Sequence, residues 1–528
     1  MTQLPVLHPS LRRRHLESIT LDDTERGWTL IALTLATAAA YWSNAASFLL
    51  VGDISGNLGA SFDEGVWLIT TYITAYAIGI ALSHRLTSFL GNRRLLSLSC
   101  LAFAVGSLGQ ACSTNMPTFL VFRAIAGVAG GAFLPRSLVF LTHRYERPNR
   151  VVPMRNFAIG FLSIGMVIAP VASGWLSDNI SWRMAFAAPI PLAIIAAYLF
   201  HTFAAKHWIE VVEEHRPDVA GIILLIAGVT TLQVLLDRGE INGWFESNGI
   251  CALAGAALIT NGAFLVWQFL PHNKHPLINA YHIFDRGMLA GVVLAVSLGM
   301  GLSGSTYVLY QYLREVETHS ALQTGVLMGV VGLSIVLTMG NVPLIVRMLL
   351  RFGGRKLIFV ALVCQMIAMF LLMKNVTSDT PDRYLWIPLV LSGIFMGIMI
   401  PCLSLAAFAK MDNQSISNAR TLYYCVRELG ASLGVTLTDI LVDRRTSLHS
   451  QRLLEEAFRH GVPTNTSYAA LSGAVMRQAL VLSYQDVFLV MGAIALFTCF
   501  LLPLLPVPPK RTPVATPSAS ALAPTGSK

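Results

Sequence analysis

The chain has 528 residues, of which 54% are hydrophobic and only 12% are charged. A soluble protein carries about 25% charged residues, so this composition excludes a soluble multidomain enzyme. The formal net charge is +9. Such an excess of Lys and Arg occurs on nucleic-acid-binding proteins, but in a membrane protein it collects in the cytoplasmic loops. The positions of the charges along the chain decide between these two explanations.

The two ends of the chain differ from everything between them. Residues 1–26 are polar, contain Arg12-Arg13-Arg14 and lack the short apolar core and small-residue cleavage site of a signal peptide. We expect them to form a cytoplasmic N-terminal segment. Residues 507–528 are rich in Pro, Ala, Thr and Ser, which predicts a disordered cytoplasmic tail.

About fourteen apolar runs lie between these ends. Each is close to the length that a helix needs to cross a bilayer of about 30 Å. In lipid the backbone must satisfy its own hydrogen bonds, so we expect every run to be a helix. The runs lie near 27–51, 65–85, 95–113, 117–141, 154–176, 184–204, 218–236, 248–270, 287–313, 321–346, 357–374, 384–409, 418–442 and 484–506.

The basic residues predict the topology. If both termini are inside, most of the 37 Lys and Arg residues fall in inner segments, as the positive-inside rule requires. Several of the outer ones lie in the 443–483 loop, where length weakens the rule. The distribution therefore predicts an even number of spans with both termini cytoplasmic. It also explains the positive charge without any nucleic acid.

Two similar turns suggest an internal repeat. Gly91–Leu95 follows the second apolar run and Gly353–Leu357 follows the tenth, and both are short, basic and glycine-containing. Two related halves with a cavity between them are a common plan for secondary transporters. We expect an N-terminal six-helix half at 27–204, an inserted two-helix linker at 205–286 and a C-terminal six-helix half at 287–506.

Six stretches in chain order carry a resemblance to a known family. They are Gly56–Gly59 with Trp67–Thr70, Phe122–Pro135, Gly165–Trp182, Leu232–Phe245, Arg427–Gly434 and Leu482–Tyr484. In these stretches the chain resembles the fourteen-span drug:proton antiporters of the major facilitator superfamily, the EmrB/QacA type. The resemblance implies an all-α polytopic membrane protein with the major facilitator fold, in which two six-helix halves flank an inserted helix pair.

The first span departs from the family pattern. Where the family usually carries an Asp, this chain has Ser43 and Asn44, and the nearest carboxylate is Asp53, about three turns later. The usual proton-coupling acid is therefore missing. If protons drive transport, another acid must carry them.

Arg123 is the first candidate for proton coupling. A charge in the middle of a membrane span costs about 2.5–3.5 kcal/mol on insertion scales, which makes it a functional candidate by default. Arg123 lies inside the fourth run among Gly127, Gly130 and Gly131. We hypothesise that it favours ionisation of a nearby acid or relays a proton. The alternative is a structural hydrogen bond to a facing carbonyl.

The thirteenth run holds the other candidates, Arg427, Glu428 and Asp439. Neighbouring helix positions point about 100° apart, so we expect Arg427 and Glu428 not to face each other. If Glu428 faces the cavity, it is a plausible proton carrier. Alternatively, both charges lie in water at the inner end of the span. Asp439 faces almost the same side eleven residues later and is the weaker candidate.

Gly165, Pro170 and Gly174 occupy the fifth run. The resemblance implies that they form the antiporter motif, which helps to seal the cavity against proton leak. Close helix packing and a proline kink explain the same residues without any transport role. In contrast, we expect Asp237 and Arg238, where the seventh run ends, to form a structural turn or salt bridge.

Aromatic and sulfur side chains are candidates for the substrate surface. Such side chains suit an adaptable apolar cavity for a small lipophilic substrate. In membrane helices, however, most of them face lipid or other helices. The cavity candidates are Ser43, Asn44, Phe48, Tyr72, Tyr76, Tyr307, Tyr310 and Met396.

The 443–483 loop is the largest predicted element outside the membrane. Leu453, Leu454 and Phe458 alternate with charged residues in the pattern of a short amphipathic helix. We expect this periplasmic loop either to dock a periplasmic adaptor protein, which would link the exporter to an outer-membrane channel, or to rest on the membrane surface.

The motifs of other function classes are missing from the sequence. There is no P-loop, which argues against an ATP-driven pump, and neither H-E-x-x-H nor G-x-S-x-G occurs. His272, His275 and His282 lack acidic neighbours, so we expect no metal and no cofactor.

The sequence therefore predicts a secondary transporter of the bacterial inner membrane and not an enzyme. Proton influx would drive export of hydrophobic or amphiphilic drugs. One alternative shares the fold but exports an organic anion, siderophore or metabolite. An alternative of another class is a membrane sensor or enzyme without transport.

Overall fold

The computed structural model describes residues 23–145, 149–204, 218–270, 273, 286–407, 416–460 and 468–504. These residues form helices and connecting turns, with no β-strand among them. The all-α prediction is thus confirmed. The predicted N-terminal segment lies almost entirely outside the described residues. The C-terminal tail and the three histidines of the 272–282 segment also lie outside them.

The described residues of the N-terminal half form ten helical segments. Helix boundaries follow local capping chemistry. The side chain of Asn115, for example, accepts a hydrogen bond from the backbone N–H of Thr118 and so caps the helix that begins at Met116. The segments are α2 (Asp23–Leu58), α3 (Phe62–Gly65), α4 (Trp67–Cys112), α5 (Met116–Gly130), α6 (Phe133–Arg144), α7 (Val151–Leu162), the π-helix η2 (Ser163–Ile168), α8 (Ala169–Asn179), α9 (Trp182–Ala187) and α10 (Pro189–Phe203).

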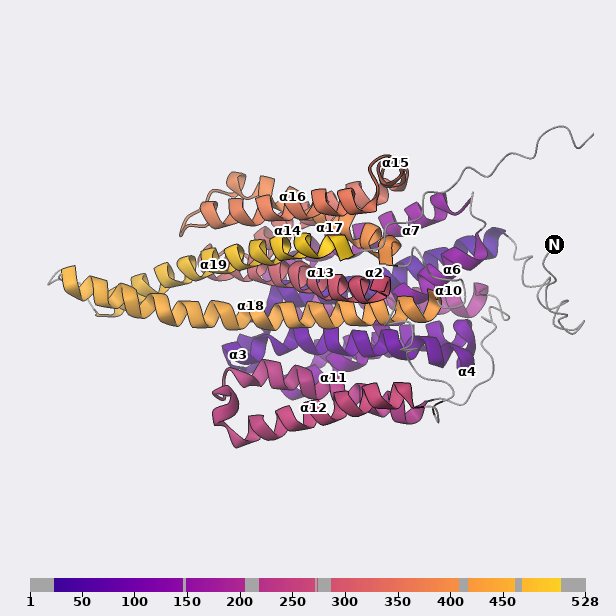
Figure 1. Ribbon diagram of the computed structural model, residues 1–528, viewed down its shortest axis with the longest axis horizontal. Coiled ribbons are helices and arrows are strands. Elements are labelled where there is room, and N and C mark those ends of the chain that lie inside the picture. Colours follow the sequence, from indigo (N-terminus) through magenta and orange to yellow (C-terminus); the bar gives the residue numbers. More distant parts are fainter. Residues whose placement is uncertain are drawn as a thin grey trace, which may run out of the picture.

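The inserted pair consists of α11 (Val219–Gly239) and α12 (Asn248–Phe269), joined through the short helix η3 (Trp244–Glu246). The pair lies along one edge of the bundle next to α4 (Figure 1). Helix α11 packs against α4 and α12, and also against α18 of the other half. Helix α12 is peripheral, with Leu258 and Ile259 more than 70% exposed. Its outer surface therefore suits contact with lipid.

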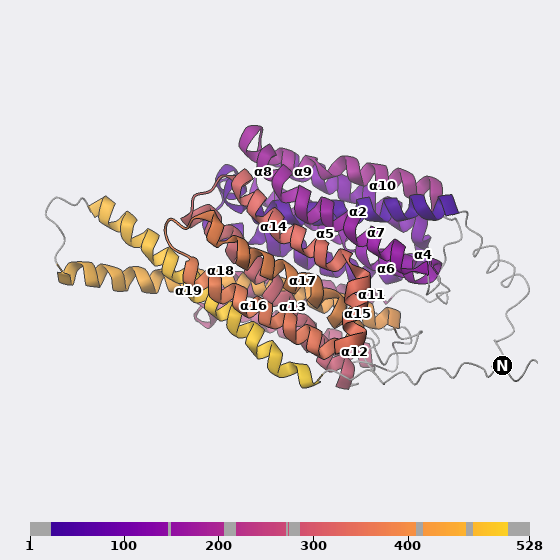
Figure 2. The same ribbon diagram turned by 90° about the horizontal axis from the view of Figure 1, so that it is seen from above.

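The C-terminal half has the same general plan, and Figure 2 shows the two halves gathered on opposite sides of the bundle. Its segments are α13 (Arg286–Gln311), the π-helix η5 (Tyr312–Val316), α14 (Ala321–Gly340), α15 (Val342–Phe352), α16 (Gly354–Asn375), η6 (Asp382–Tyr384), α17 (Trp386–Ala407), α18 (Ile416–His460), α19 (Tyr468–Leu501) and η7 (Leu502–Leu504). The predicted fold of two helical halves and an inserted pair is confirmed.

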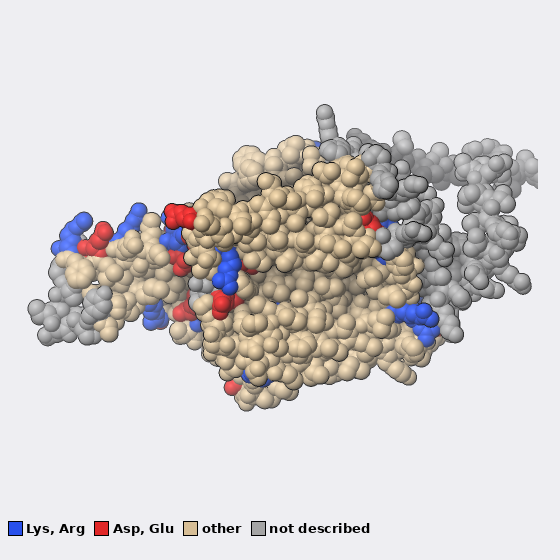
Figure 3. Space-filling model, turned by 90° about the horizontal axis from the view of Figure 1, so that it is seen from below, with Lys and Arg blue, Asp and Glu red and all other residues tan. Residues whose placement is uncertain are grey.

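Among the described residues, eleven helical segments are long and apolar enough to cross a membrane. One of them is the 46-residue α4, whose backbone is not helical at Gly91, so it contains two segments of crossing length. Helices α2 and α18 are also long but more polar and are not among the eleven. Fourteen crossings therefore remain a prediction. Figure 3 shows the expected apolar belt, because charged side chains on that face gather towards its two ends.

The two halves share a backbone feature at the turns noted in the sequence. Gly91 has φ 72° and ψ 157°, and Gly353 has φ 82° and ψ 153°, a region that only glycine adopts readily. Two residues after each glycine, an arginine binds the end of the last helix of its own half. Arg93 donates to the carbonyl of His201, and Arg355 to that of Pro503 at 3.1 Å. The repeat is therefore present in the geometry as well as in the sequence.

Helices α18 and α19 project beyond all other helices as an antiparallel hairpin (Figures 1 and 2). The described part of the hairpin reaches His460 on α18 and restarts at Tyr468 on α19. We call this end of the bundle the hairpin face. The predicted amphipathic segment around Phe458 is part of α18, and the Phe458 side chain is 63% exposed.

Polar contacts join the two halves on the hairpin face. Arg314 of the π-helix η5 forms an ion pair with Asp53 of α2 at 2.6 Å. Asp178 at the end of α8 accepts hydrogen bonds from the backbone N–H groups of Ala321 and Leu322, at 3.2 and 2.8 Å. These two N–H groups start α14, where a carboxylate is favoured by the helix dipole. The halves are thus held together at this end.

Candidate functional site

A cavity lies between the two halves and consists of two adjoining pockets. Helix α2 and the π-helix η2 line both pockets from the N-terminal half, and α13 lines both from the C-terminal half. The residues common to both pockets are Tyr41, Asn44, Met166, Leu302 and Ser303. A site shared by both halves changes its exposure when the halves move, which is what a transporter requires.

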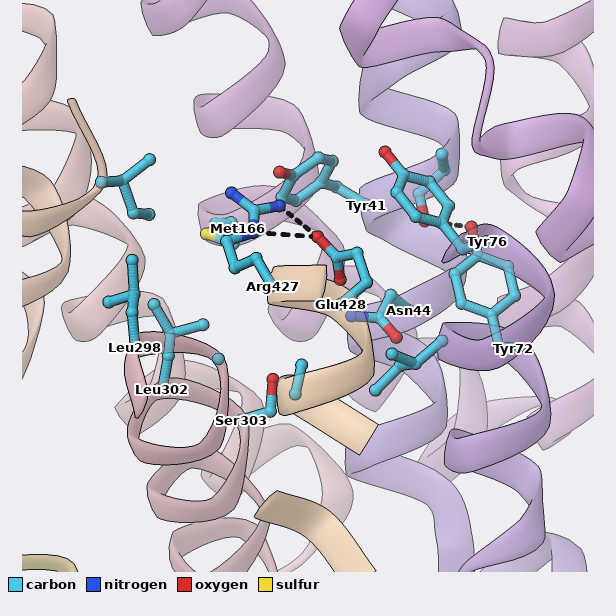
Figure 4. Close-up of a pocket in the computed structure, with 15 residues that line it drawn as sticks. Tyr41, Asn44, Tyr72, Tyr76, Met166, Leu298, Leu302, Ser303, Arg427 and Glu428 are labelled. Atoms are coloured by element: carbon cyan, nitrogen blue, oxygen red, sulfur yellow. Dashed lines mark hydrogen bonds and ion pairs between the residues drawn. The ribbon is translucent and has the colours of Figure 1, made fainter. Parts of the chain in front are cut away.

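The first pocket contains the charged side chains Arg427 and Glu428 of α18 (Figure 4). They form an ion pair in which the guanidinium also donates through Nε to Glu428 Oε1 at 3.1 Å. The sequence-based expectation that they do not face each other is wrong. The 100° between adjacent positions separates only the Cβ atoms, and the long Arg427 side chain bends back to reach its neighbour. Both side chains are mostly buried, at 12% and 15% exposed.

Polar atoms without a partner lie in the same pocket. Asn44 Oδ1 and the Tyr76 hydroxyl are buried and have no hydrogen-bond partner among the described residues. Both side chains line the pocket beside Glu428, and Figure 4 shows them on the side of the cavity formed by the N-terminal half. A buried polar atom that is left unpaired costs free energy, so a bound polar group would be favoured here.

The second pocket has no charged side chain in its lining. Phe48 of α2 and Tyr310 of α13 stack across the two halves, with ring centroids 6.0 Å apart and an interplanar angle of 27°. Met328, Val331 and Met396 complete the apolar wall. Flexible thioethers adapt to substrates of different shape. The cavity therefore has one end with a charged pair and one end without charge.

The motif at Gly165, Pro170 and Gly174 shapes the cavity wall. Gly165 and Pro170 line the second pocket, and Pro170 follows the π-helix η2 directly after the first residue of α8. Gly174 allows α8 to touch α14 of the other half. A Cβ atom at this position would lie 2.4 Å from the carbonyl oxygen of Ala321. The close packing expected of small residues is present, and it occurs between the halves.

Arg123 lies outside this cavity and is fully buried. Its guanidinium donates to Leu68 O at 2.9 Å, Ser43 Oγ at 2.8 Å, Gln110 Oε1 at 3.2 Å and the Ser47 hydroxyl. These acceptors are all neutral. They belong to α2 and α4, so Arg123 joins both helices to α5. This geometry fits the structural alternative raised for Arg123.

Tyr72 separates Arg123 from the cavity. Its ring lies 4.1 Å from the guanidinium carbon of Arg123, and its hydroxyl donates to Ala40 O at 2.9 Å. The same side chain lines the first pocket, as expected. Tyr72 therefore holds the positive charge of Arg123 behind one aromatic layer.

Two cavity candidates are engaged elsewhere. Ser43 is fully buried and bound to Arg123, so its expected place in the cavity wall is wrong. Tyr307 donates to Asp439 Oδ1 at 2.6 Å instead of lining either pocket. Asp439 therefore lies beside Tyr307 and away from the Arg427–Glu428 pair. The other candidates line at least one of the two pockets: Asn44, Phe48, Tyr72, Tyr76, Tyr310 and Met396.

The sequence interpretation missed several contributors to the site, among them Tyr41, Met166 and Met328. Tyr41 and Met166 line both pockets, and Met328 lines the second. Tyr41 lies three positions before Asn44 on α2, a spacing that places two side chains on one face of a helix. This spacing could have identified Tyr41. Met166 lies in the π-helix, where the usual helical spacing does not apply.

Comparison with known proteins agrees with this geometry. The family model described as Major Facilitator Superfamily matches residues 31–435. The Probable multidrug resistance protein EmrY of Escherichia coli (strain K12) is 29% identical over 490 residues, which cover 88% of this chain and 92% of that protein. The Multidrug export protein EmrB of the same strain is 26% identical over 453 residues, covering 85% and 86%.

Solved structures share the fold at low sequence identity. An auto-inhibited peptide transporter of the POT family has a TM-score of 0.61 and 13% identity, over 92% of this chain and 98% of that one. The partially occluded inward-open xylose transporter XylE from E. coli has a TM-score of 0.59 and 12% identity, over 93% and 100%. At this identity the likeness concerns the fold alone.

A helical membrane bundle with two related halves around a shared cavity defines the class of secondary transporters. The family match and the fold agree with that class. This chain belongs to the Major Facilitator Superfamily and is a transporter, not an enzyme. The resemblance to the EmrB type of this superfamily is confirmed by the relatives EmrY and EmrB.

Proposed function

We propose that this protein is a proton-coupled antiporter that exports hydrophobic or amphiphilic drugs by alternating access of the central cavity. The relatives named as multidrug resistance and multidrug export proteins, similar over most of the chain, support drug export. The superfamily and the cavity shared by the halves support alternating access.

The observation that carries the proposal is the Arg427–Glu428 pair in the cavity wall. Ionised Glu428 is balanced by Arg427. A proton on Glu428 removes the negative charge and releases the guanidinium, so the cavity becomes more positive. A cationic substrate and a proton therefore compete for the same carboxylate. Such competition is sufficient to couple export of one to import of the other.

The two ends of the cavity suggest the substrate class. Asn44 and Tyr76 offer unpaired hydrogen-bonding atoms beside Glu428, whereas Phe48, Tyr310 and Met396 form an apolar wall. A molecule with a polar head and an apolar body matches both ends. We assign supporting roles to Arg123, which fixes the position of Tyr72, and to Asp439, which holds Tyr307.

Proton/substrate exchange in inverted membrane vesicles tests the proposal. A lipophilic cation added to energised vesicles should collapse part of the pH gradient, and Glu428→Gln should abolish this response. Arg123→Ala should lower the yield of folded protein more than it lowers proton-coupled transport per folded molecule. If no lipophilic cation or anion perturbs the gradient in vesicles that contain the unsubstituted protein, the antiporter proposal is refuted.

A second candidate function is export of an organic anion. The Fatty acid resistance protein FarB of Neisseria gonorrhoeae is 25% identical over 482 residues, which cover 88% of this chain. Arg427 would meet an anionic head group once Glu428 is protonated. A cavity that prefers anions should transport a long-chain carboxylate in preference to a cation of the same length, and Arg427→Gln should remove this preference.

We also propose a location in the bacterial inner membrane with both termini in the cytoplasm. The hairpin of α18 and α19 would then project into the periplasm and dock an adaptor protein that leads to an outer-membrane channel. The exposed Phe458 provides the test. Phe458→Asp should reduce drug export from whole cells but leave transport in proteoliposomes unchanged. Equal export from cells would instead favour a hairpin that rests on the membrane.

A further inference from the structure

The last two turns of α11, in the inserted pair, bind both halves of the transporter. The Asp237 carboxylate accepts a hydrogen bond from the Thr70 hydroxyl of α4 at 2.9 Å and from the Thr436 hydroxyl of α18 at 2.6 Å. Gln233, one turn earlier on α11, donates to the same carboxylate at 2.8 Å. Asp237 is only 9% exposed. It therefore lies inside a junction of three helices.

Neighbouring side chains extend this junction in both directions. Arg238 lies with its guanidinium carbon 4.4 Å from the ring of Trp67 on α4. Glu240 accepts two hydrogen bonds from Arg444 of α18, at 2.6 and 2.5 Å. We call Gln233, Asp237, Arg238 and Glu240 the α11 clamp. Its contacts alternate between the N-terminal and the C-terminal half.

The α11 clamp lies where helices of the two halves must separate during transport. It lies on the hairpin face, the same end of the bundle as the Asp53–Arg314 ion pair. Nearby, the Thr74 hydroxyl of α4 lies 3.4 Å from the Ser432 hydroxyl of α18. Helices α4 and α18 must separate here if the cavity is to open towards the hairpin face. Asp237 cannot keep both threonine hydroxyls when they separate.

Hydrogen-bond energetics determine which state the α11 clamp favours. Hydrogen bonds to an ionised carboxylate are stronger than neutral ones, and a buried carboxylate that loses a donor is penalised. The closed arrangement satisfies Asp237 with three donors. Any arrangement that parts Thr70 from Thr436 leaves it with fewer. The closed hairpin face is therefore the favoured state.

We propose that the α11 clamp holds the hairpin face closed and that Asp237 is a positioning residue of the transport cycle. The inserted pair then regulates the opening of the cavity as well as connecting the two halves. This inference rests on the alternating access of the proposed function. It requires no particular substrate or driving ion.

Spin-label distances across the hairpin face test this proposal. The full chain is placed in nanodiscs after its seven cysteines are replaced by alanine, and labels are attached at Gly56→Cys and Asp379→Cys, one in each half. Both positions are exposed. Asp237→Ala should raise the population of the long-distance, open form by about tenfold, the effect of losing about one charge-assisted hydrogen bond. Thr70→Val and Thr436→Val should shift the distances in the same direction but less.

Asp218 at the other end of α11 provides a matched control. It is also buried, and it accepts hydrogen bonds from Gly221 N at 2.8 Å and Trp267 Nε1 at 2.7 Å within the inserted pair. Its electrostatic partner Arg85 belongs to the N-terminal half. Asp218→Ala disturbs the same helix but does not touch the junction with α18, so it should leave the label distances unchanged.

The outcomes separate this proposal from the proposed function. Unchanged distances in Asp237→Ala and Thr436→Val, with normal size-exclusion profiles, refute the α11 clamp. An equal shift in Asp218→Ala also refutes it. If Asp237→Ala does not fold, the two threonine variants decide the question. If the protein exports no drug but the spin-label distances shift as expected, the antiporter proposal is contradicted and the α11 clamp is supported.

Discussion

Two buried arginines show how differently the halves use the same residue type. Arg123 in the N-terminal half is fully buried and hydrogen-bonded to neutral oxygens of α2 and α4. Arg427 in the C-terminal half lines the cavity and pairs with one carboxylate, Glu428. The first arginine has many acceptors that do not titrate. The second has a single carboxylate as its partner.

A charge inside the membrane therefore identifies a functional region only when its partner is known. Arg123 can hold three helices together in every state, because none of its acceptors changes protonation. Arg427 loses its counter-charge whenever Glu428 is protonated. We therefore propose that Arg123 and its acceptors hold α2, α4 and α5 together. We assign the coupling of proton and substrate transport to the Arg427–Glu428 pair.

Loss of the titratable partner should produce the largest effect. Glu428→Gln keeps the size of the side chain but cannot take up a proton, so proton-driven export should fall by about 100-fold. Substrate exchange across the membrane without a pH gradient should persist, because that reaction needs no net proton transfer. Counterflow and gradient-driven uptake in proteoliposomes measure the two activities side by side. Equal losses in both would remove the distinction between the two arginines.

Removal of Arg123 should affect stability more than coupling. Arg123→Met leaves several buried oxygens without a donor, so we expect a loss of about 3 kcal/mol in stability. Arg123→Lys keeps the charge but lacks the planar fork, and should recover only part of the loss. Melting temperature and folded yield report the stability, and transport per folded molecule should stay near that of the unsubstituted protein. A fully stable but uncoupled Arg123→Met protein would contradict this account.

A substitution at Gly174 tests the close contact between the halves at α8 and α14. In Gly174→Ala the new Cβ atom would lie 2.4 Å from the carbonyl oxygen of Ala321, so α8 and α14 must move apart. We expect the rate of proton-coupled transport to fall roughly tenfold, because protons would then leak through the loosened contact without moving substrate. Gly52→Ala is the control, because no atom lies within 4 Å of its Cβ position.

The apolar end of the cavity should contribute a smaller effect. Phe48→Ala removes one side of the stack with Tyr310, so KM for large lipophilic substrates should rise several-fold at unchanged kcat. Phe497→Ala removes a ring that is 61% exposed on the surface of the helix bundle, and it should change neither constant. An equal change in both variants would argue against substrate binding at Phe48.

The smallest effect concerns pH on the hairpin face. Hydrogen bonds from Arg444 hold the pKa of Glu240 below its usual value of 4.5. The contact therefore stabilises the fold fully above pH 4.5, and this contribution disappears as pH falls through the lowered pKa. The melting temperature of Glu240→Gln should differ slightly from that of the parent protein at pH 7. The difference should vanish at the lowest pH, and a difference that persists there would exclude this charge effect.

The helices and the repeat could be predicted from the sequence because they depend on local patterns. Apolar length determines the helices. The turns at Gly91 and Gly353 have matching backbone angles because both need a conformation that favours glycine. Gly165 and Gly174 also lie where small residues allow close approach.

The direction of individual side chains could not be predicted with the same ease. Ser43 and Asn44 are adjacent on α2 and point about 100° apart, so one binds Arg123 and the other lines the cavity. Tyr307 and Tyr310 differ by about 60°, which is enough to turn Tyr307 away from the cavity. A helix pattern alone does not set the rotation of each helix in the bundle.

Contacts between distant segments were the least accessible from the sequence. Asp237 is 167 positions from Thr70 and 199 positions before Thr436. The sequence identified Asp237 only as the end of a span, because no local pattern places α11 between α4 and α18. The packing of the two halves creates this junction.

The central claim is that substrate and proton compete at Glu428. The most direct test adds a lipophilic cation to the purified protein in weakly buffered detergent solution and follows proton release with a pH indicator. Our account predicts release of protons from the unsubstituted protein and none from Glu428→Gln, although both bind the cation. Equal proton release from the two proteins would contradict it.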